Sequence, residues 1–165
     1  LYVLAYPPVN TRSPINTVVG AVAGAIPALM GAAASGPLGM TAFALFTLVY
    51  LWQFPHFMAI AWLYRQDYSA GGMKMLTVVD PSGRRAANQS LAAALALIPI
   101  AWLPLLDVPA GGVYLAGVTL LGFVQASFAL HFHTRRDNAS ARWLLWVSLV
   151  YLPAVLLLLL LGPMV

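Results

Sequence analysis

The sequence predicts an all-α membrane protein, a polytopic bundle of transmembrane helices. Hydrophobic residues make up 62% of the chain and charged residues only 7%, whereas a soluble domain carries about 25% charged residues. The apolar residues form long runs, and a helix of roughly 20 such residues can cross a bilayer. These runs recur along the whole chain, so a cleaved signal peptide does not explain them. We therefore expect an integral, multi-pass protein whose first partner is the lipid bilayer.

Polar segments divide the apolar sequence into five predicted spans. We expect these spans at residues 17–34, 40–63, 88–106, 113–132 and 143–161. Residues 1–6 are predicted as the tail of another helix, which Pro7 and Pro8 end because proline lacks a backbone donor and restricts the residue before it. Because the chain starts within a predicted helix and without an initiator methionine, we expect one transmembrane domain, residues 1–165, whose N-terminal part is missing.

The basic residues predict how the spans are oriented. All eight lie in alternate connections between spans: Arg12, Arg65, Lys74, Arg84, Arg85, Arg135, Arg136 and Arg142. Basic connections stay on the cytoplasmic side of a membrane, so the C-terminus is expected on the opposite side. The net charge of +4 then reflects membrane orientation, and we expect no nucleic-acid partner. The chain has no cysteine, which excludes thiol catalysis and cysteine-ligated metals.

The few polar groups gather at the end of the second predicted span. Residues 52–57 read WQFPHF there, and residues 64–76 read YRQDYSAGGMKML. Pro55 predicts a kink that frees a backbone carbonyl nearby. If the helix continued beyond the span, His56 and Asp67 would lie about 20° apart around its axis and about 16 Å apart along it. Ionisable residues in membranes usually mark a functional path. For His56 this interpretation and a structural hydrogen bond to a neighbouring helix both remain open.

Asp67 has a functional and a structural interpretation. Its carboxylate could bind Mg²⁺ shared with substrate phosphates, with Arg65 and Lys74 neutralising the phosphate charge. A solvated loop with a weak local salt bridge is the alternative, and the residues alone favour it. Arg12 and Asn16, predicted on the same membrane face, could complete a phosphate pocket. Their alternative, also favoured on the residues alone, is a membrane anchor and a helix cap.

Four separated motifs resemble one known family. Residues 6–17 look like its Tyr-Thr-Pro-Leu-Lys-Arg-x-Ser/Thr-Pro-x-Asn-Thr segment, and residues 20–31 like its Gly/Ala-rich helix with an Ala-x-Pro-Pro turn. Residues 52–57 are similar to its Trp-Gln-x-Pro-His motif, and residues 65–76 to its Arg-x-Asp-Tyr-x-x-Ala/Gly-Gly-x-x-Met segment. Together these motifs resemble the protohaem IX farnesyltransferases (haem O synthases), which are UbiA-type intramembrane prenyltransferases.

The resemblance implies a fold of nine helices, of which this chain would form the end of the fourth and the fifth to ninth. It implies transfer of a farnesyl group from farnesyl diphosphate to a vinyl group of haem B, making haem O for haem-copper terminal oxidases. The membrane would be the bacterial plasma membrane or the mitochondrial inner membrane, with haem A and oxidase assembly proteins as candidate partners. Carried over, Asp67 would bind the magnesium diphosphate, surrounded by Tyr68, Arg65, Lys74, Arg12 and Asn16. Haem would be held by His56, supported by Trp52 and Gln53.

The chain departs from this family pattern in three places. Asn10 and Thr11 replace its Lys-Arg pair, and Ala28 replaces its second proline. An Asn/Asp-rich first motif would precede this chain, so we expect the chain to be inactive alone. A UbiA-type enzyme with a quinone-precursor acceptor is the nearest alternative, but it would carry a second aspartate where this chain has Gly71, and would lack the motif at residues 52–57. A transporter would need interrupted helices in paired halves, which are not evident.

Overall fold

Five long helices dominate the structure, a computed structural model that describes residues 16–107 and 111–162. They are α2 (Asn16–Ser35), α3 (Met40–Leu63), α6 (Arg84–Ile100), α7 (Gly112–Arg135) and α8 (Asn138–Leu161). Two short helices, α4 (Arg65–Ala70) and α5 (Leu76–Val79), connect α3 to α6, and a 3-10 helix, η1 (Leu103–Leu106), follows α6. The long helices, with η1 counted as an extension of α6, are long and apolar enough to cross a membrane. The predicted all-α transmembrane bundle is confirmed, whereas the predicted helix tail at residues 1–6 lies outside the described residues.

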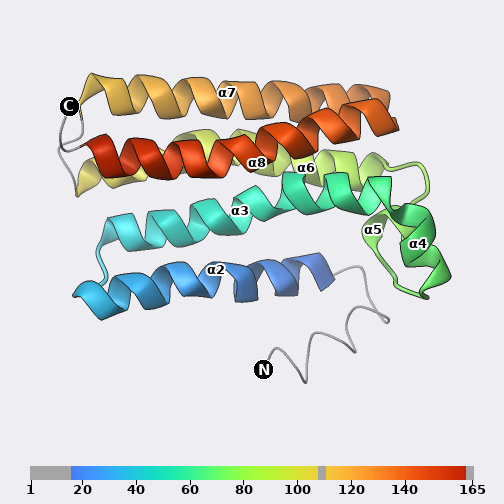
Figure 1. Cartoon of the computed structure of the whole chain (residues 1–165), viewed down its shortest axis with the longest axis horizontal. Helices are drawn as coiled ribbons and strands as arrows, with labels where there is room; N and C mark the ends of the chain where they lie inside the picture. The colour runs from blue at the N-terminus through green and yellow to red at the C-terminus, as the bar shows by residue number, and fades with distance from the viewer. Residues whose placement is uncertain (1–15, 108–110, 163–165) are drawn as a thin grey trace.

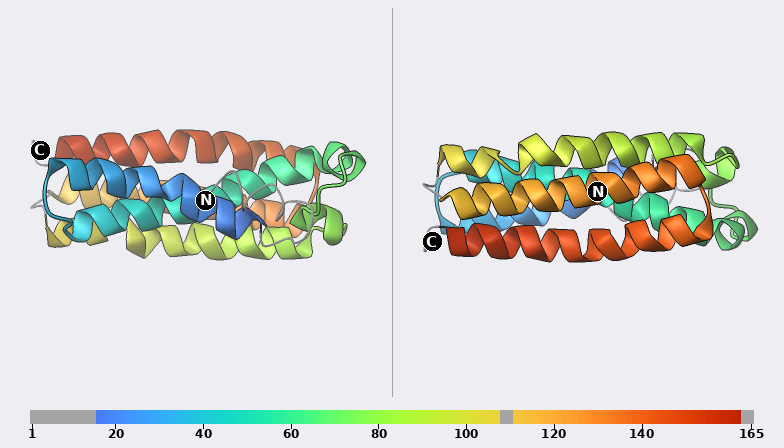
Figure 2. Two further views of the ribbon diagram at one scale, coloured as in Figure 1. Left: turned by 90° about the horizontal axis from the view of Figure 1, so that it is seen from below. Right: turned by 90° about the horizontal axis from the view of Figure 1, so that it is seen from above.

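Four of the helices form a ring and the fifth packs against it. α3 packs on α6 and α8, and α7 closes the ring by packing on the same two helices. α2 lies against α3, on the side away from α7 (Figures 1 and 2). The pairs of long helices named here run in opposite directions (Figure 1). α3 is thus the helix that connects the ring to α2, and it carries the WQFPHF motif.

Small residues allow the helices to approach closely, as they do in many membrane proteins. Near the α4 end, Ala59, Ala129 and Ala141 are fully buried together with Phe132 and Leu144. Gly24 of α2 faces α3 so closely that a Cβ atom there would overlap the side-chain oxygen of Gln53. An alanine at this position would require the Gln53 side chain to move.

All basic residues within the described ranges lie at one end of the bundle, which we call the polar end. It comprises the C-termini of α3 and α7, the N-termini of α6 and α8, and the short helices α4 and α5 (Figure 1). Seven basic residues lie there: Arg65, Lys74, Arg84, Arg85, Arg135, Arg136 and Arg142. Their predicted clustering at one end is confirmed; Arg12 lies outside the described residues.

The two charged connections are shorter than predicted. The loop expected at residues 64–87 contains two short helices, and α6 already begins at Arg84. The loop expected at residues 133–142 is reduced to a two-residue turn, because α7 continues to Arg135 and α8 begins at Asn138. Long basic side chains can extend from a helical backbone to water, so charge alone does not end a membrane helix.

Capping groups set the actual ends of these helices. Gly83 precedes α6 in the left-handed conformation (φ 68°), and the Asp80 carboxylate accepts a hydrogen bond from the backbone N–H of Arg85. Asp137 precedes α8 and forms a capping box with Ser140, whose backbone N–H donates to its carboxylate over 2.7 Å. Asp80 and Asp137 therefore stabilise the turns that precede α6 and α8.

Candidate active site

Trp52 and His56 form a stacked pair on the face of α3 that meets α8. Their rings lie 4.7 Å apart between centroids and 19° from parallel, as their spacing of one helical turn allows. His56 Nδ1 lies 2.9 Å from the hydroxyl of Ser148 on α8, and Trp52 Nε1 donates to the backbone carbonyl of the same residue over 2.6 Å. Phe57 contacts the His56 ring edge to face at 5.4 Å. This half-buried imidazole is therefore held from both α3 and α8.

Gln53 points to the other side of α3. Its side-chain nitrogen donates to the backbone carbonyls of Ala21 (2.9 Å) and Val49 (3.2 Å), and the residue is only 5% exposed. One residue further along a helix turns the side chain by about 100°, which places Gln53 between α2 and α3. The structure thus brings Trp52 and His56 together but separates Gln53 from them.

Asp67 lies on α4, beyond a break in the helix. α3 ends at Leu63, and Tyr64 (φ −104°, ψ 22°) leaves the helical conformation before α4 begins. The shared helical face considered for His56 and Asp67 requires a continuous helix, so that geometry does not occur. Asp67 is exposed at the polar end, and none of the described basic residues forms an ion pair with it. Its carboxylate is accessible to a ligand.

Two of the other predicted diphosphate residues, Tyr68 and Lys74, belong to the same connection between α3 and α6. Tyr68 lies one residue further along α4, half-buried, and Lys74 is exposed between α4 and α5. Asn16 is the first residue of α2, whose N-terminus points toward the polar end (Figure 1), but its side chain lies outside the described part of the chain, as does Arg12. α4 and the segment after it therefore gather Asp67, Tyr68 and Lys74 on one outgoing connection.

Arg65 is fixed more firmly than the sequence indicates. One of its guanidinium nitrogens donates to the carbonyl of Trp62 (2.6 Å) and to the side-chain oxygen of Asn138 on α8 (3.0 Å). The guanidinium also lies 4.5 Å from the centre of the Trp62 ring, within the range of a cation–π interaction. The other guanidinium N–H groups of Arg65 have no hydrogen-bond partner among the described residues.

The described residues contain no cluster of three or more metal-ligand side chains. No group of three histidine, cysteine or acidic residues in the ranges 16–107 and 111–162 could hold a metal ion by itself. Mg²⁺ commonly needs only one or two protein carboxylates when substrate phosphates supply further oxygens. The exposed Asp67 carboxylate fits this mode, and a closed protein metal site does not.

Two other acids near the polar end have structural partners. The pKa of Asp80 lies below its usual value, first because the Ser82 hydroxyl donates to its carboxylate and then because the Arg85 backbone N–H does. The pKa of Asp137 is lowered by hydrogen bonds from the backbone and side chain of Ser140. Both carboxylates are engaged in capping, which distinguishes them from Asp67.

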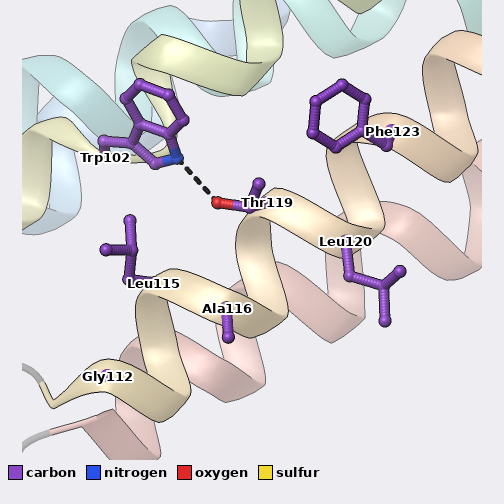
Figure 3. Close-up of a pocket in the computed structure, with 7 residues that line it drawn as sticks. All are labelled: Trp102, Gly112, Leu115, Ala116, Thr119, Leu120 and Phe123. Carbon is purple, nitrogen blue, oxygen red and sulfur yellow. Dashed lines mark hydrogen bonds between the residues drawn. The ribbon is translucent and has the colours of Figure 1, made fainter.

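A large groove lies at the opposite end of the bundle (Figure 3). It encloses about 680 Å³ beside η1 and the start of α7, and is lined by Trp102, Gly112, Leu115, Ala116, Thr119, Leu120 and Phe123. Its polar contact is a hydrogen bond from Trp102 Nε1 to the Thr119 hydroxyl, 3.0 Å long. The groove is apolar and open, and it is remote from the candidate site at the polar end.

Sequence reasoning missed two residues of α8 that contact the site. Ser148 binds both members of the Trp52–His56 pair, and Asn138 binds Arg65. A signal for Ser148 exists, because it is a polar residue in the largely apolar run WLLWVSLVY. No comparable signal marks Asn138, which lies among other polar residues at the start of α8.

Comparison with known proteins shows similarity along most of the chain. The UbiA prenyltransferase family matches residues 1–152. Protoheme IX farnesyltransferase of Salinibacter ruber is 41% identical over 96% of this chain and 56% of its own length. The mitochondrial proteins of that name from Arabidopsis thaliana and Homo sapiens are 42% and 40% identical over 93% and 97% of this chain, and over 36% of their own lengths. The chain thus spans about half the length of the bacterial relative. No solved structure matches it.

Proposed function

Because the chain belongs to the UbiA prenyltransferase family, we propose that it forms part of an intramembrane enzyme that transfers a farnesyl group from farnesyl diphosphate to a vinyl group of haem B, giving haem O. The observation that carries this proposal is the identity of about 40% to proteins named protoheme IX farnesyltransferase, over more than nine tenths of this chain. Haem O would serve haem-copper oxidases, so the proposed partners are proteins that take part in haem A formation or oxidase assembly.

The polar end would bind the diphosphate. Asp67 supplies an accessible carboxylate, and Mg²⁺ held there would add positive charge beside the leaving diphosphate. Arg65 and Lys74 would neutralise the negative charge that develops on the diphosphate as its bond to farnesyl C1 breaks. Tyr68 lies beside Asp67 on α4 and would contact the same group. Arg12 and Asn16 complete this proposed set.

The α3–α8 interface would hold the acceptor. His56 and Trp52 would present aromatic surface and a ring nitrogen to haem B. The π electrons of its vinyl group would form the new bond to farnesyl C1 as the bond from C1 to the diphosphate breaks. Water would then add to the cation left on the other vinyl carbon and lose a proton, giving the hydroxyl group of haem O. Gln53 would support the proposed haem site indirectly, because its hydrogen bond to the Ala21 carbonyl holds α2 against α3. The apolar surroundings would limit the access of water to the allylic cation.

The positive-inside rule supports an orientation with the polar end on the cytoplasmic or matrix side and the C-terminus opposite. The chain has no cysteine, so single cysteines can report it. Ser69→Cys at the polar end and Ser35→Cys at the other end both replace exposed residues. In intact bacterial cells a maleimide that cannot cross the inner membrane should label position 35 and reach position 69 only after lysis. The opposite pattern would refute this orientation.

A chimera tests the activity. This chain would replace the matching 160 residues of the Salinibacter ruber relative, and membranes containing the chimera would receive farnesyl diphosphate with either haem B or a hydroxybenzoate quinone precursor. We expect farnesylated haem, detected by chromatography and mass spectrometry of the extracted haems. A folded, inserted chimera that prenylates only the hydroxybenzoate would overturn the proposal in favour of an aromatic acceptor. The unmodified relative serves as the positive control.

A further inference from the structure

Two short contacts of the Ser148 hydroxyl determine which ring nitrogen of His56 carries a proton. Ser148 Oγ lies 2.7 Å from the backbone carbonyl oxygen of Leu145 and 2.9 Å from His56 Nδ1. A carbonyl oxygen has no proton to donate, so the hydrogen in the first contact is the single hydroxyl proton of Ser148. The hydrogen in the second contact must then come from His56. The imidazole is therefore protonated at Nδ1, and its neutral form has its lone pair on Nε2.

The orientation of the same ring is also determined by Ser148. The indole of Trp52 stacks on His56 and donates its N–H to the Ser148 carbonyl. Ser148 itself is fully buried. Nε2 has no hydrogen-bond partner in the described part of the chain, and the His56 side chain is only half-buried. One serine thus controls both the tautomer and the position of a histidine whose free nitrogen can be approached.

We propose that Ser148 is a positioning residue that holds His56 with Nδ1 protonated and so presents Nε2 to the iron of haem. This inference rests on the proposed function, in which haem B is the acceptor. Metal-binding histidines usually donate their other ring N–H to a fixed oxygen, which sets the tautomer and raises the basicity of the ligating nitrogen. Here the fixed oxygen is a hydroxyl whose own proton is already engaged. Binding of the iron to Nε2 would fix the position of haem and leave the vinyl group at the porphyrin edge free to react.

The tautomer can be measured without haem or turnover. The chain would be labelled with ¹⁵N-histidine, placed in lipid nanodiscs at neutral pH, and compared by NMR with its His56→Gln variant to assign the signal. We expect a protonated Nδ1 and an unprotonated Nε2. Ser148→Ala should abolish this preference and Ser148→Thr should retain it. A wild-type His56 protonated at Nε2, or an unchanged tautomer in Ser148→Ala, would overturn the proposal.

Ser127→Ala provides a matched control. Ser127 also donates its hydroxyl proton to a backbone carbonyl within its own helix, over 2.7 Å, but it is exposed and makes no hydrogen bond to a histidine in the described part of the chain. Its replacement should leave the His56 signals unchanged. A similar change in both serine variants would attribute the effect to the lost helix contact rather than to the His56 contact, and would overturn the proposal.

Haem binding gives a second readout. Titration of the same nanodiscs with haem B should show a histidine-ligated Soret band that is lost in His56→Ala. Ser148→Ala should weaken haem binding about 10- to 100-fold, the usual effect of removing such a partner, with Ser148→Thr restoring it. Equal affinity in Ser148→Ala and wild type would refute the positioning role. If the chain binds haem in this way but the chimera forms no haem O, the proposed reaction fails and the role of Ser148 is supported.

Discussion

Gly83→Ala should destabilise the polar end through a specific collision with Trp62. Gly83 has φ 68°, and a Cβ atom built there would overlap the Trp62 ring. The ring cannot move freely, because it packs edge to face on Phe132 at 5.9 Å and under the Arg65 guanidinium. A non-glycine residue in the left-handed region costs about 1–2 kcal/mol, and overpacking a filled site costs about 1–3 kcal/mol more. The expected total is about 2–5 kcal/mol.

Gly72→Ala separates these two costs. Gly72 has the same φ of 68°, but a Cβ atom there would meet nothing within 4 Å. This variant should therefore lose only the conformational part, about 1–2 kcal/mol. Reversible unfolding in mixed detergent micelles, followed by circular dichroism, would measure both. The difference of about 1–3 kcal/mol isolates the contact with Trp62.

A double-mutant cycle provides the decisive comparison. In a Trp62→Leu background the collision is removed, so adding Gly83→Ala should cost no more than Gly72→Ala costs in the wild type. Equal destabilisation of the wild-type chain by Gly83→Ala and Gly72→Ala would refute the collision with Trp62. The same cost of Gly83→Ala with and without the indole would also refute it.

Three further results are expected. Asp67→Asn in the chimera should abolish haem O formation without affecting insertion, because the exposed carboxylate has no structural partner in the described chain; normal haem O yield in extracted membranes would contradict its diphosphate role. Gln125→Met should raise the free energy of unfolding by about 1–3 kcal/mol, since both amide atoms of Gln125 are buried without a partner in the described chain; a lower stability in the same micelle assay would instead indicate a bound partner for this amide. The pKa of the Asp137 carboxyl is lowered in the folded state. The ionised carboxylate therefore stabilises the fold at pH values above the pKa of the unfolded chain, about 3.9. This stabilisation is lost as the pH falls through the lower pKa of the folded state. Asp137→Asn should flatten this part of the pH–stability curve, and an unchanged slope would exclude the contribution.

Hydropathy was sufficient to predict the architecture because bilayer thickness restricts the length of an apolar helix. The ends of the helices were less predictable. Arg84 and Arg135 are charged yet helical, because side chains can reach water while backbone hydrogen bonding continues. The capping box of Asp137 and Ser140, which ends the second connection early, could be identified only once the register of the turn was known.

The candidate site was predictable as a set of residue types but not as a geometry. Trp52, Gln53 and His56 belong to one motif, yet the helical turn of about 100° per residue sends Gln53 to α2 and the other two to α8. Ser148 lies 92 residues from His56, and only the packing of α8 against α3 determines that they meet. No proline or glycine marks the break at Tyr64, so the sequence does not predict that the helix ends between His56 and Asp67.

The proposed diphosphate site and the proposed haem site both make hydrogen bonds to α8. Near the polar end, Arg65 is bound to Asn138 at the start of this helix; deeper in the bundle, His56 and Trp52 are bound to Ser148 of the same helix. The predicted diphosphate residues follow α3 directly, so a shift of α8 along α3 would alter the Arg65 contact and the His56 contact together. Prenyl transfer requires the leaving diphosphate and the acceptor to be aligned within a fraction of an ångström to a few ångströms. In the proposed reaction the α3–α8 pair would maintain that alignment through two polar contacts along one helix, since a single contact would still allow rotation about it.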